Sequence, residues 1–316
     1  MLLFTVLTVL GLGLLVVSAD KLIEEGTAIA EQLGMSPLII GLTVVAFGTS
    51  FPELIFTTGA SLSGSGGLAI GNIVGSNITN TLLILGIAAL IRPLPIEHTM
   101  IWRDGAVWAA ATIVFVVFLF TQSSLGPLHG SVLLVILAGY LFQLLRQDAV
   151  ELPSAEDANS DDPSDQAPQK RTKTALVILL SLIGIALGSE IAIYGATGLA
   201  NALGVSESVI GLSIIALGTS LPELATVVVC VRRNQSGMLV GNIIGSNIFN
   251  ILACIGIPAL FVGIQTPVEM LSFSVPFLVL ISVVALAMLR TNWTITRLEG
   301  AVCLCGYGVY LATITQ

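Results

Sequence analysis

Two glutamates in nearly identical surroundings are the residues best placed to do chemistry. Glu53 ends the run Gly-Thr-Ser-Phe-Pro-Glu at 48–53, and Glu223 ends Gly-Thr-Ser-Leu-Pro-Glu at 218–223. Each lies near the middle of a long apolar stretch. A carboxylate at the centre of a membrane-spanning helix is costly, and it usually marks an ion or proton path. Lys and Arg are absent from the middles of the apolar stretches, so a proton or a bound cation must neutralise these glutamates.

The residues around each glutamate favour a bound cation. Glycine and proline directly before the glutamates predict a break in each helix, and broken helices expose carbonyl oxygens. Oxygen ligands suit hard cations such as Ca²⁺, Mg²⁺ and Na⁺. The candidate oxygen ligands are the carboxylates of Glu53 and Glu223, the carbonyls of Ala46, Thr49, Ala216 and Thr219, and the hydroxyls of Thr49, Ser50, Thr219 and Ser220.

A second duplicated motif supplies the facing wall of this site. Gly-Asn-Ile-Val-Gly-Ser-Asn at 71–77 is repeated as Gly-Asn-Ile-Ile-Gly-Ser-Asn at 241–247. Four-residue spacing places Ser76 with Asn80, and Ser246 with Asn250, on one helix face. The Gly-x-x-x-Gly spacing would let helices approach closely. Asn72, Asn77, Asn242 and Asn247 are expected to form interhelical hydrogen bonds rather than to bind ions.

Composition places the chain in a membrane. The 316 residues are 55% hydrophobic and 9% charged, whereas soluble domains average roughly 25% charged residues. This excludes a soluble enzyme, and a nucleic-acid binder would need a basic face. An intramembrane enzyme is disfavoured because no His or Lys base lies near the candidate nucleophiles. The cysteines (230, 254, 303 and 305) and the histidines (98 and 129) show no metal-binding spacing, so no cofactor is expected.

Both motifs recur at one offset of 170 residues, which indicates two copies of one unit. We predict repeats at 1–146 and 170–316, joined by a flexible acidic linker at 147–169. The expected spans are 2–19, 36–62, 68–91, 105–121, 128–145, 174–194, 206–231, 238–262, 271–289 and 299–315. Five spans per copy force the second copy to start on the opposite face of the membrane. The fold class is therefore an all-α polytopic membrane protein with ten transmembrane helices in two inverted five-helix repeats.

The basic residues predict the orientation of these spans. All 11 Lys and Arg residues fall in loops on one side: 21, 92, 103, 146, 170, 171, 173, 232, 233, 290 and 297. Positive residues favour the cytoplasm, so the linker should be cytoplasmic and both termini extracytoplasmic. The first apolar stretch resembles a signal peptide but lacks a preceding positive charge, so it is expected to be a span. Asp20 and Glu190 are expected at the membrane interface rather than on an ion access path.

The doubled motifs resemble those of the cation/calcium exchanger superfamily, and in particular its prokaryotic sodium/calcium exchangers. The resemblance covers essentially the whole chain and implies ten helices in two inverted repeats. It implies that Glu53 and Glu223 are central calcium and sodium ligands and that spans one and six slide against the other helices. It assigns flanking sodium positions to the Ala46 and Ala216 carbonyls and to Thr49, Ser50, Ser76, Thr219, Ser220 and Ser246. Asn250 stands where some prokaryotic members and the potassium-dependent members have Asp, and this resembles the pattern of K⁺-independent exchangers.

Charge counting suggests how such a site would work. Two glutamates are balanced by one Ca²⁺ or two Na⁺, so the ions should compete and exchange rather than travel together. The resemblance implies three Na⁺ per Ca²⁺ and net charge movement by alternating access across the plasma (prokaryotic inner) membrane. Acid should inhibit transport because close carboxylates without a cation hold a proton. A Ca²⁺/H⁺ antiporter and, less favoured, a passive cation channel remain alternatives. The lipid bilayer is the expected partner, with no nucleic acid and no obligate protein.

Overall fold

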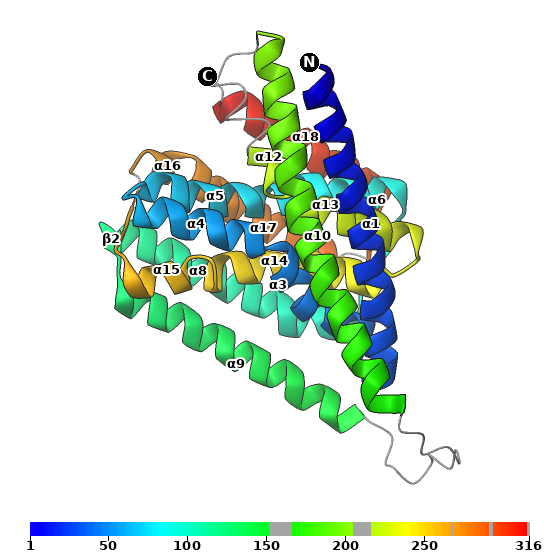
Figure 1. The fold of residues 1–316 in the computed structure, drawn as a ribbon. Helices are drawn as coiled ribbons and strands as arrows, with labels where there is room; N and C mark the ends of the chain where they lie inside the picture. Colours follow the sequence, from blue (N-terminus) through cyan, green and yellow to red (C-terminus); the bar gives the residue numbers. More distant parts are fainter. Residues whose placement is uncertain (152–165, 205–215, 267, 291–292, 315–316) are drawn as a thin grey trace.

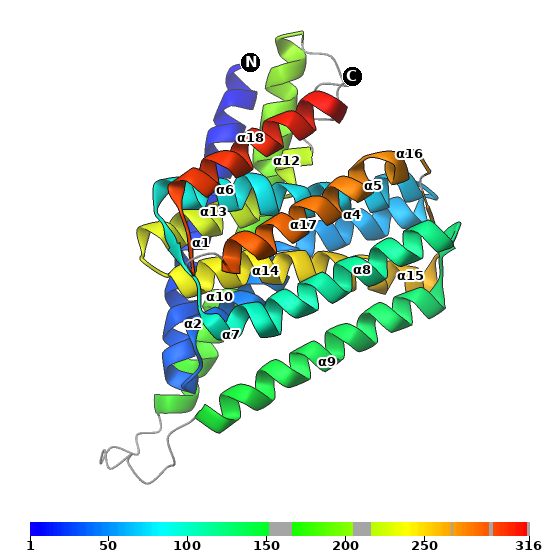
Figure 2. The same cartoon turned by 180° about the vertical axis from the view of Figure 1, so that it is seen from behind.

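The computed structural model describes residues 1–316 except 152–165, 205–215, 267, 291–292 and 315–316. Helices dominate it, as Figure 1 and Figure 2 show from opposite sides. The elements up to residue 151 are α1 (Leu2–Leu33), α2 (Pro37–Ile40), the π-helix η1 (Gly41–Val45), α3 (Ala46–Thr49), α4 (Phe51–Leu62), α5 (Gly66–Ile78), the π-helix η2 (Thr79–Ile84), α6 (Leu85–Ile91), β1 (Leu94–Pro95), α7 (His98–Met100), the π-helix η3 (Ile101–Gly105), α8 (Ala106–Thr121), β2 (Ser124–Leu125) and α9 (Pro127–Glu151).

The second part of the chain follows the same order of elements. It comprises α10 (Gln166–Ala202), α12 (Ala216–Gly218), α13 (Leu221–Arg232), α14 (Ser236–Leu252), α15 (Gly256–Phe261), β3 (Ile264–Gln265), α16 (Val268–Ser272), α17 (Ser274–Arg290), β4 (Thr294–Ile295) and α18 (Arg297–Ile314). The chain is therefore mostly helical, with four two-residue strands in the described part.

Seven helical segments among the described residues are long and apolar enough to cross a membrane, or eight if the bent pair Pro37–Thr49 and Phe51–Leu62 forms one span. Of the other two expected spans, 299–315 corresponds largely to α18, and 206–231 begins outside the described residues. The chain is a multi-pass membrane protein by these criteria, and the count of ten stays a prediction.

The first and sixth expected spans are longer than predicted. Spans at 2–19 and 174–194 were expected, whereas α1 extends to Leu33 and α10 covers Gln166–Ala202. Polar residues such as Lys21 do not end α1; it ends at Gly34, which adopts a left-handed conformation with φ 66°. The predicted linker at 147–169 overlaps helices at both ends, because 147–151 belong to α9 and 166–169 to α10; the remaining 152–165 lie outside the described residues.

Helices α1 and α10 pack against each other in antiparallel directions (Figure 1). Gly11 of α1 faces Ala192, whereas Gly188 of α10 faces Leu15. Residue numbers that increase along α1 therefore lie beside residue numbers that decrease along α10. A Cβ added at either glycine would come within 2.4 to 2.7 Å of a backbone nitrogen of the other helix. Glycine therefore sets the distance between these two helices.

The core of the bundle contains the segments that carry the second motif. In the most apolar 18-residue stretches of Gly66–Ile91 and Ser236–Phe261, 78% and 89% of the stretch is buried. In α1 the corresponding share is 22%. α14 packs closely on η1 and α3, because a Cβ at Gly241 or Gly245 would lie within 2.8 Å of a backbone oxygen of Leu38 or Leu42. The close approach expected from Gly-x-x-x-Gly is present at these glycines. The matching contacts in the first copy would involve 205–215, outside the described residues.

Two short antiparallel sheets connect the two copies, and each sheet takes one strand from each copy. β1 pairs with β4, and β2 pairs with β3. Leu94 lies opposite Ile295, and Leu125 lies opposite Ile264. The 170-residue offset relates β1 to β3 and β2 to β4, so it converts one sheet into the other. This pairing is the arrangement expected when two equivalent units face each other across a pseudo-twofold axis.

Basic residues from distant parts of the chain gather at one end of the bundle. Arg92 donates to the side chain of Asn234, Arg290 lies over the ring of Trp102, and Arg297 donates to the Ile91 carbonyl. The loops that carry Arg92, Arg290 and Arg297 therefore lie on the same side of the bundle, as the sequence predicts. Which side of the membrane they face stays a prediction.

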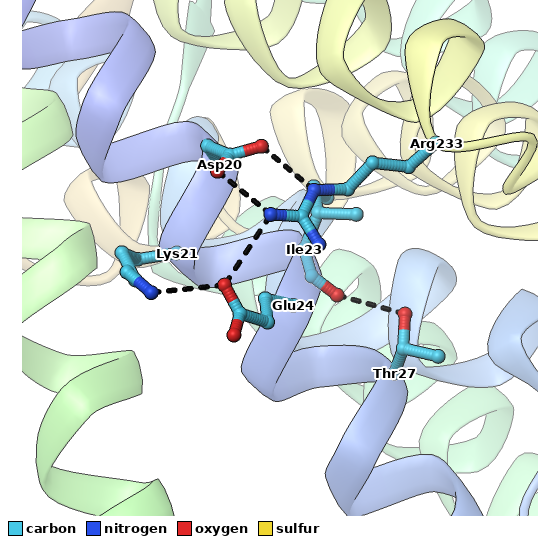
Figure 3. Close-up of polar contacts among 6 residues, drawn as sticks. All are labelled: Asp20, Lys21, Ile23, Glu24, Thr27 and Arg233. Carbon is cyan, nitrogen blue, oxygen red and sulfur yellow. Dashed lines mark hydrogen bonds and ion pairs between the residues drawn. The ribbon is translucent and has the colours of Figure 1, made fainter.

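An ion pair at this end connects α1 to the turn between α13 and α14 (Figure 3). Arg233 donates from Nε and Nη2 to the two carboxylate oxygens of Asp20, each at 2.7 Å, and from Nη2 to Glu24 at 3.3 Å. Lys21 donates to the same Glu24 oxygen at 2.9 Å. Hydrogen bonding to Asp20 raises the pKa of Arg233. Asp20 therefore has a specific structural partner at the end of α13.

Candidate ion-binding site

Both glutamates lie in the first turn of a helix that starts after a break. In the first copy α3 ends at Thr49, and α4 begins at Phe51 with a bend of 42°. In the second copy Thr219 and Ser220 separate α12 from α13. Proline occupies the start of both α4 and α13, where its missing N–H is not needed. The predicted breaks are therefore present, and each glutamate sits at the positive end of a helix dipole.

The two carboxylates are fully enclosed by protein. Glu53 is 0% exposed and Glu223 is 1% exposed. Ser76 Oγ donates to Glu53 Oε1 at 3.4 Å, and Ser50 Oγ donates to Glu223 Oε1 at 3.3 Å. Ser50 belongs to the first copy, so this second hydrogen bond joins the copies at the glutamate. Neither glutamate takes part in an ion pair among the described residues.

Threonine and asparagine form a duplicated set of hydrogen bonds around the glutamates. Thr49 Oγ1 donates to Asn242 Oδ1 at 3.2 Å, and its counterpart Thr219 donates to Asn72 Oδ1 at 3.5 Å. Both bonds cross from one copy to the other. Asn242 Nδ2 in turn donates to Thr226, and Asn72 Nδ2 donates to Thr57, one position away from the counterpart of Thr226. The asparagines of the second motif therefore make the interhelical hydrogen bonds expected of them at these two positions.

Several buried oxygens of the predicted ligand set have no hydrogen-bond partner among the described residues. They are Glu53 Oε2, Glu223 Oε2, Ser220 Oγ and Asn80 Oδ1. Leaving a buried polar atom unpaired is costly, and leaving a carboxylate oxygen unpaired is more so. Such atoms in a native structure point to a bound ion, a water or a functional role. The donor chemistry is entirely oxygen, which suits hard cations.

The helices widen at Asn80 and Asn250, which follow the second motif in each copy. Asn80 lies in the π-helix η2, and Cys254 donates its backbone N–H five residues back to Phe249, across Asn250. Widened turns of this kind are frequent at functional sites because they redirect side chains. Asn80 and Asn250 are both buried, at 1% and 0% exposure. Each copy therefore directs one carboxamide into the interior at the same point of the repeat.

Family comparison identifies the chain. The model of the sodium/calcium exchanger protein family matches residues 3–146 and 173–316. The chain belongs to the sodium/calcium exchanger protein family. The two matched stretches of this family member lie 170 residues apart, the same offset that relates its motifs.

Relatives match along most of their length. The sodium/calcium exchanger MaX1 of Methanosarcina acetivorans is 32% identical, with 96% of each chain covered. The inner membrane protein YrbG of Escherichia coli is 39% identical over 82% of this family member and 80% of YrbG. The solved structure of the sodium-calcium exchanger NCX_Mj, soaked with Na⁺ and Sr²⁺, superimposes on this chain with a TM-score of 0.84 at 30% sequence identity. The match covers 99% of this chain and 98% of the NCX_Mj chain.

The predicted ligand residues gather in the interior of this family member, with one departure. The side chains of Thr49, Ser50, Glu53, Ser76, Asn80, Thr219, Ser220, Glu223, Ser246 and Asn250 are all buried. Ser246 lies 3.4 Å from the Thr49 hydroxyl. The Ala46 carbonyl, expected to be freed by the break, instead accepts from the Ser50 N–H and lies 3.3 Å from the Thr49 hydroxyl. Ala216 lies at the start of α12, directly before the second break.

The cysteines and histidines are placed as structural residues. His129 accepts the Gly126 N–H at its Nδ1, and His98 stacks on Trp293. Among the described residues, no cluster of three or more His, Cys, Asp and Glu side chains could hold a metal ion. Cys254, however, is next to the site, since its sulfur lies 3.6 Å from the Ser50 carbonyl oxygen. Its sequence context, an apolar run, contained no signal of this proximity.

Proposed function

We propose that this chain is a secondary active antiporter that exchanges Na⁺ for Ca²⁺ at one site formed by both copies. Glu53 and Glu223 supply the charge, and Thr49, Ser50, Ser76, Thr219, Ser220, Ser246, Asn80 and Asn250 supply neutral oxygens. The Ala46 and Ala216 carbonyls flank the site. The observation that carries this proposal is the pair of buried carboxylates, each with one unpartnered oxygen and no basic partner among the described residues.

The charge of the site gives exchange rather than cotransport. Two ionised carboxylates leave a charge of about −2 in a low-dielectric interior, which is unfavourable without a counterion. One Ca²⁺ or two Na⁺ neutralise it, so the two ions compete for the same carboxylates. A third Na⁺ per Ca²⁺ makes the cycle electrogenic. Asn250 adds a neutral oxygen where a carboxylate would add charge, and we therefore propose exchange without K⁺.

Alternating access requires one group of helices to move relative to the other. The pair α1 and α10 is the candidate mobile unit, because the two helices pack closely on each other and the family resemblance assigns sliding to spans one and six. A cavity of about 230 Å³ lies between this pair and the second break, where it is lined by Leu12, Ala192, Leu217 and Gly218. A second cavity, of about 400 Å³, lies between α1 and the end of α13. The first cavity leaves room for movement beside the second break, and the second leaves room at the end of α13.

We also propose the domain organisation and orientation expected from the sequence. Repeats at 1–146 and 170–316 are inverted, the linker at 147–169 is cytoplasmic, and both termini are extracytoplasmic, giving ten spans. The interchange of the two sheets by the 170-residue offset supports the repeat. Labelling single cysteines at the termini and in the linker with an impermeant maleimide in intact cells tests the orientation. We expect labelling at the termini and not in the linker. Labelling of the linker but not of the termini would mean that the orientation is the reverse of the one proposed.

The decisive measurement is ⁴⁵Ca²⁺ uptake into proteoliposomes preloaded with Na⁺ or with K⁺. We expect uptake only with internal Na⁺, and loss of uptake in Glu53→Gln and Glu223→Gln. Glu190→Gln is the matched control, because Glu190 is exposed and has no ion-pair partner among the described residues. Uptake driven by a pH gradient without Na⁺ would replace the proposal with a Ca²⁺/H⁺ antiporter. A Ca²⁺ flux that does not saturate with Ca²⁺ concentration and that needs neither a Na⁺ gradient nor a pH gradient would indicate a channel.

Net charge movement is tested in the same vesicles. A K⁺ gradient with valinomycin clamps the membrane potential, and an inside-positive potential should accelerate Ca²⁺ entry if three Na⁺ leave for each Ca²⁺. Equal rates at both polarities would rule out electrogenic exchange. Replacing K⁺ by choline at constant Na⁺ should leave the rate unchanged if the cycle does not use K⁺.

A further inference from the structure

A chain of three asparagines connects the two copies beside the candidate site. Asn250 Nδ2 donates to Asn77 Oδ1 at 3.0 Å, and Asn77 Nδ2 donates to the backbone carbonyl of Asn247 at 3.3 Å. All three residues are 0% exposed. Asn77 lies in α5, whereas the other two lie in α14, so the hydrogen bonds cross between the copies.

The direction of these hydrogen bonds is fixed by the backbone. A carboxamide is nearly symmetric in shape, so its two ends are distinguished only by their partners. A backbone carbonyl can only accept, and Asn77 must therefore turn its NH₂ group toward Asn247. Its oxygen then faces Asn250, which must present its own NH₂ group in return. The carbonyl of Asn247 thus determines the orientation of the Asn250 carboxamide through Asn77.

This orientation places the Asn250 oxygen on the side of the site. Asn250 Oδ1 lies 3.9 Å from the Cys254 sulfur, and the same sulfur lies 3.6 Å from the Ser50 carbonyl oxygen. Ser50 donates its hydroxyl to Glu223. The Cys254 sulfur therefore connects the Asn250 oxygen to Ser50, the residue that donates to this carboxylate. A cation binds the oxygen of a carboxamide, whereas a reversed carboxamide would present NH₂ and repel it.

We propose that Asn77 is a positioning residue that holds the Asn250 carboxamide with its oxygen toward the ions. The inference rests on the proposed function, since it assigns Asn77 a role at the same site. Asn77 itself does not contact the ions. It acts on ion affinity because it keeps one neutral ligand in the orientation that a cation requires.

The matching position in the other copy lacks this arrangement. Asn247, the counterpart of Asn77, donates its side chain to Ile243 in its own helix at 2.9 Å. Asn80, the counterpart of Asn250, has no hydrogen-bond partner at either amide atom among the described residues. Only one of the two carboxamides is therefore held, although the local sequences are nearly identical. Substitution of Asn77 and of Asn247 should consequently have unequal effects.

The test compares Asn77→Leu with Asn247→Leu in Na⁺-driven ⁴⁵Ca²⁺ uptake. Losing one hydrogen bond of this kind should raise the KM for Ca²⁺ by about twofold to tenfold in Asn77→Leu, with a smaller change in Vmax. Asn247→Leu should raise KM less, because its side chain holds no ligand. The Ca²⁺-induced rise in unfolding temperature of the purified proteins measures binding independently of transport. An Asn77→Leu protein with unchanged KM and an unchanged Ca²⁺ response would overturn the assignment.

A second background separates positioning from a structural role. A carboxylate presents an oxygen whichever way it turns, so Asn250→Asp should remove the need for Asn77. Adding Asn77→Leu to Asn250→Asp should change KM by less than twofold. An equal loss in both backgrounds would mean that Asn77 only stabilises the fold. If the unsubstituted protein shows no Na⁺-driven uptake, the proposed function fails, and the Ca²⁺-induced stabilisation still decides the role of Asn77.

Discussion

Two glycines of α1 offer a sharp test of how closely α1 and α10 must pack. A Cβ added at Gly11 would lie 2.4 Å from the Ala192 backbone nitrogen and 2.7 Å from the Gly188 carbonyl oxygen. These are backbone atoms of α10, so they cannot move aside as a side chain would. At Gly13, two residues further along, an added Cβ meets no atom within 4 Å. Gly11→Ala and Gly13→Ala are therefore the same substitution in the same helix with different surroundings.

The expected magnitudes follow from this difference. Replacing glycine by alanine within a helix gains up to about 1 kcal/mol from helix propensity, and this gain is common to both variants. At Gly11 the helices must separate by about 1 Å to restore an ordinary contact, and overpacking of this kind costs about 1–3 kcal/mol. Gly11→Ala should thus be less stable than Gly13→Ala by about 1–3 kcal/mol, which corresponds to several degrees in unfolding temperature.

Thermal unfolding of the purified proteins in detergent, followed by tryptophan fluorescence, measures the difference. Gly13→Ala should match or slightly exceed the unsubstituted protein, whereas Gly11→Ala should unfold at a lower temperature. Na⁺-driven Ca²⁺ uptake should fall in Gly11→Ala alone, because α1 and α10 form the proposed mobile unit. Equal unfolding temperatures for the two variants would refute the close packing at Gly11, and equal uptake would refute its functional role.

Three further outcomes are expected. Asp20→Asn removes an ion pair between side chains that are 44% and 35% exposed, so it should lower the free energy of unfolding by at most about 1 kcal/mol. The loss should be smaller in high salt, and the control Glu190→Gln should cause no comparable loss. Tyr140→Phe removes the hydroxyl that donates to buried Asp104 at 3.0 Å and should lower stability by about 1.5–3 kcal/mol, more than Tyr310→Phe, because the acceptor is charged. Acidification should raise the KM for Ca²⁺, because protons compete for the two buried carboxylates; a KM constant between pH 8 and pH 5 would contradict this.

The features that depend on local sequence were predictable. Pro52 and Pro222 each follow a turn and must start a helix, so the breaks before the glutamates follow from residue chemistry. Burial of both glutamates follows from their positions in apolar stretches. The predicted end of the first span, at residue 19, was wrong. Hydropathy indicates which residues cross the apolar layer of the membrane, whereas the helix continues beyond that layer to Leu33. Gly34, aligned with Gly204 at the repeat offset, was the signal for the true end.

The features that depend on contacts between the copies were not predictable. Asn77 and Asn247 occupy the same position in nearly the same motif, yet Asn77 donates across the copies and Asn247 donates within its helix. The nearly identical motifs gave no sign of this difference, which depends on the packing of the surrounding helices. The same holds for Cys254, whose counterpart is Ile84 and whose nearness to Ser50 follows only from the fold. Sequence repeats therefore predict which residues gather, and the structure determines which of them are held.

Differences between equivalent positions are what an exchanger with two similar halves would need. Arg233 and Ser63 occupy equivalent turns, with φ and ψ of −88° and 4° compared with −80° and 2°. Arg233 forms an ion pair with Asp20 and so ties α1 to the bundle, whereas Glu190, the counterpart of Asp20 in α10, forms no ion pair among the described residues. In the proposed cycle, two copies with identical contacts would make the inward-facing and outward-facing states equal in energy. The duplicated residues then carry the ion chemistry, and the unduplicated contacts set the balance between the two states.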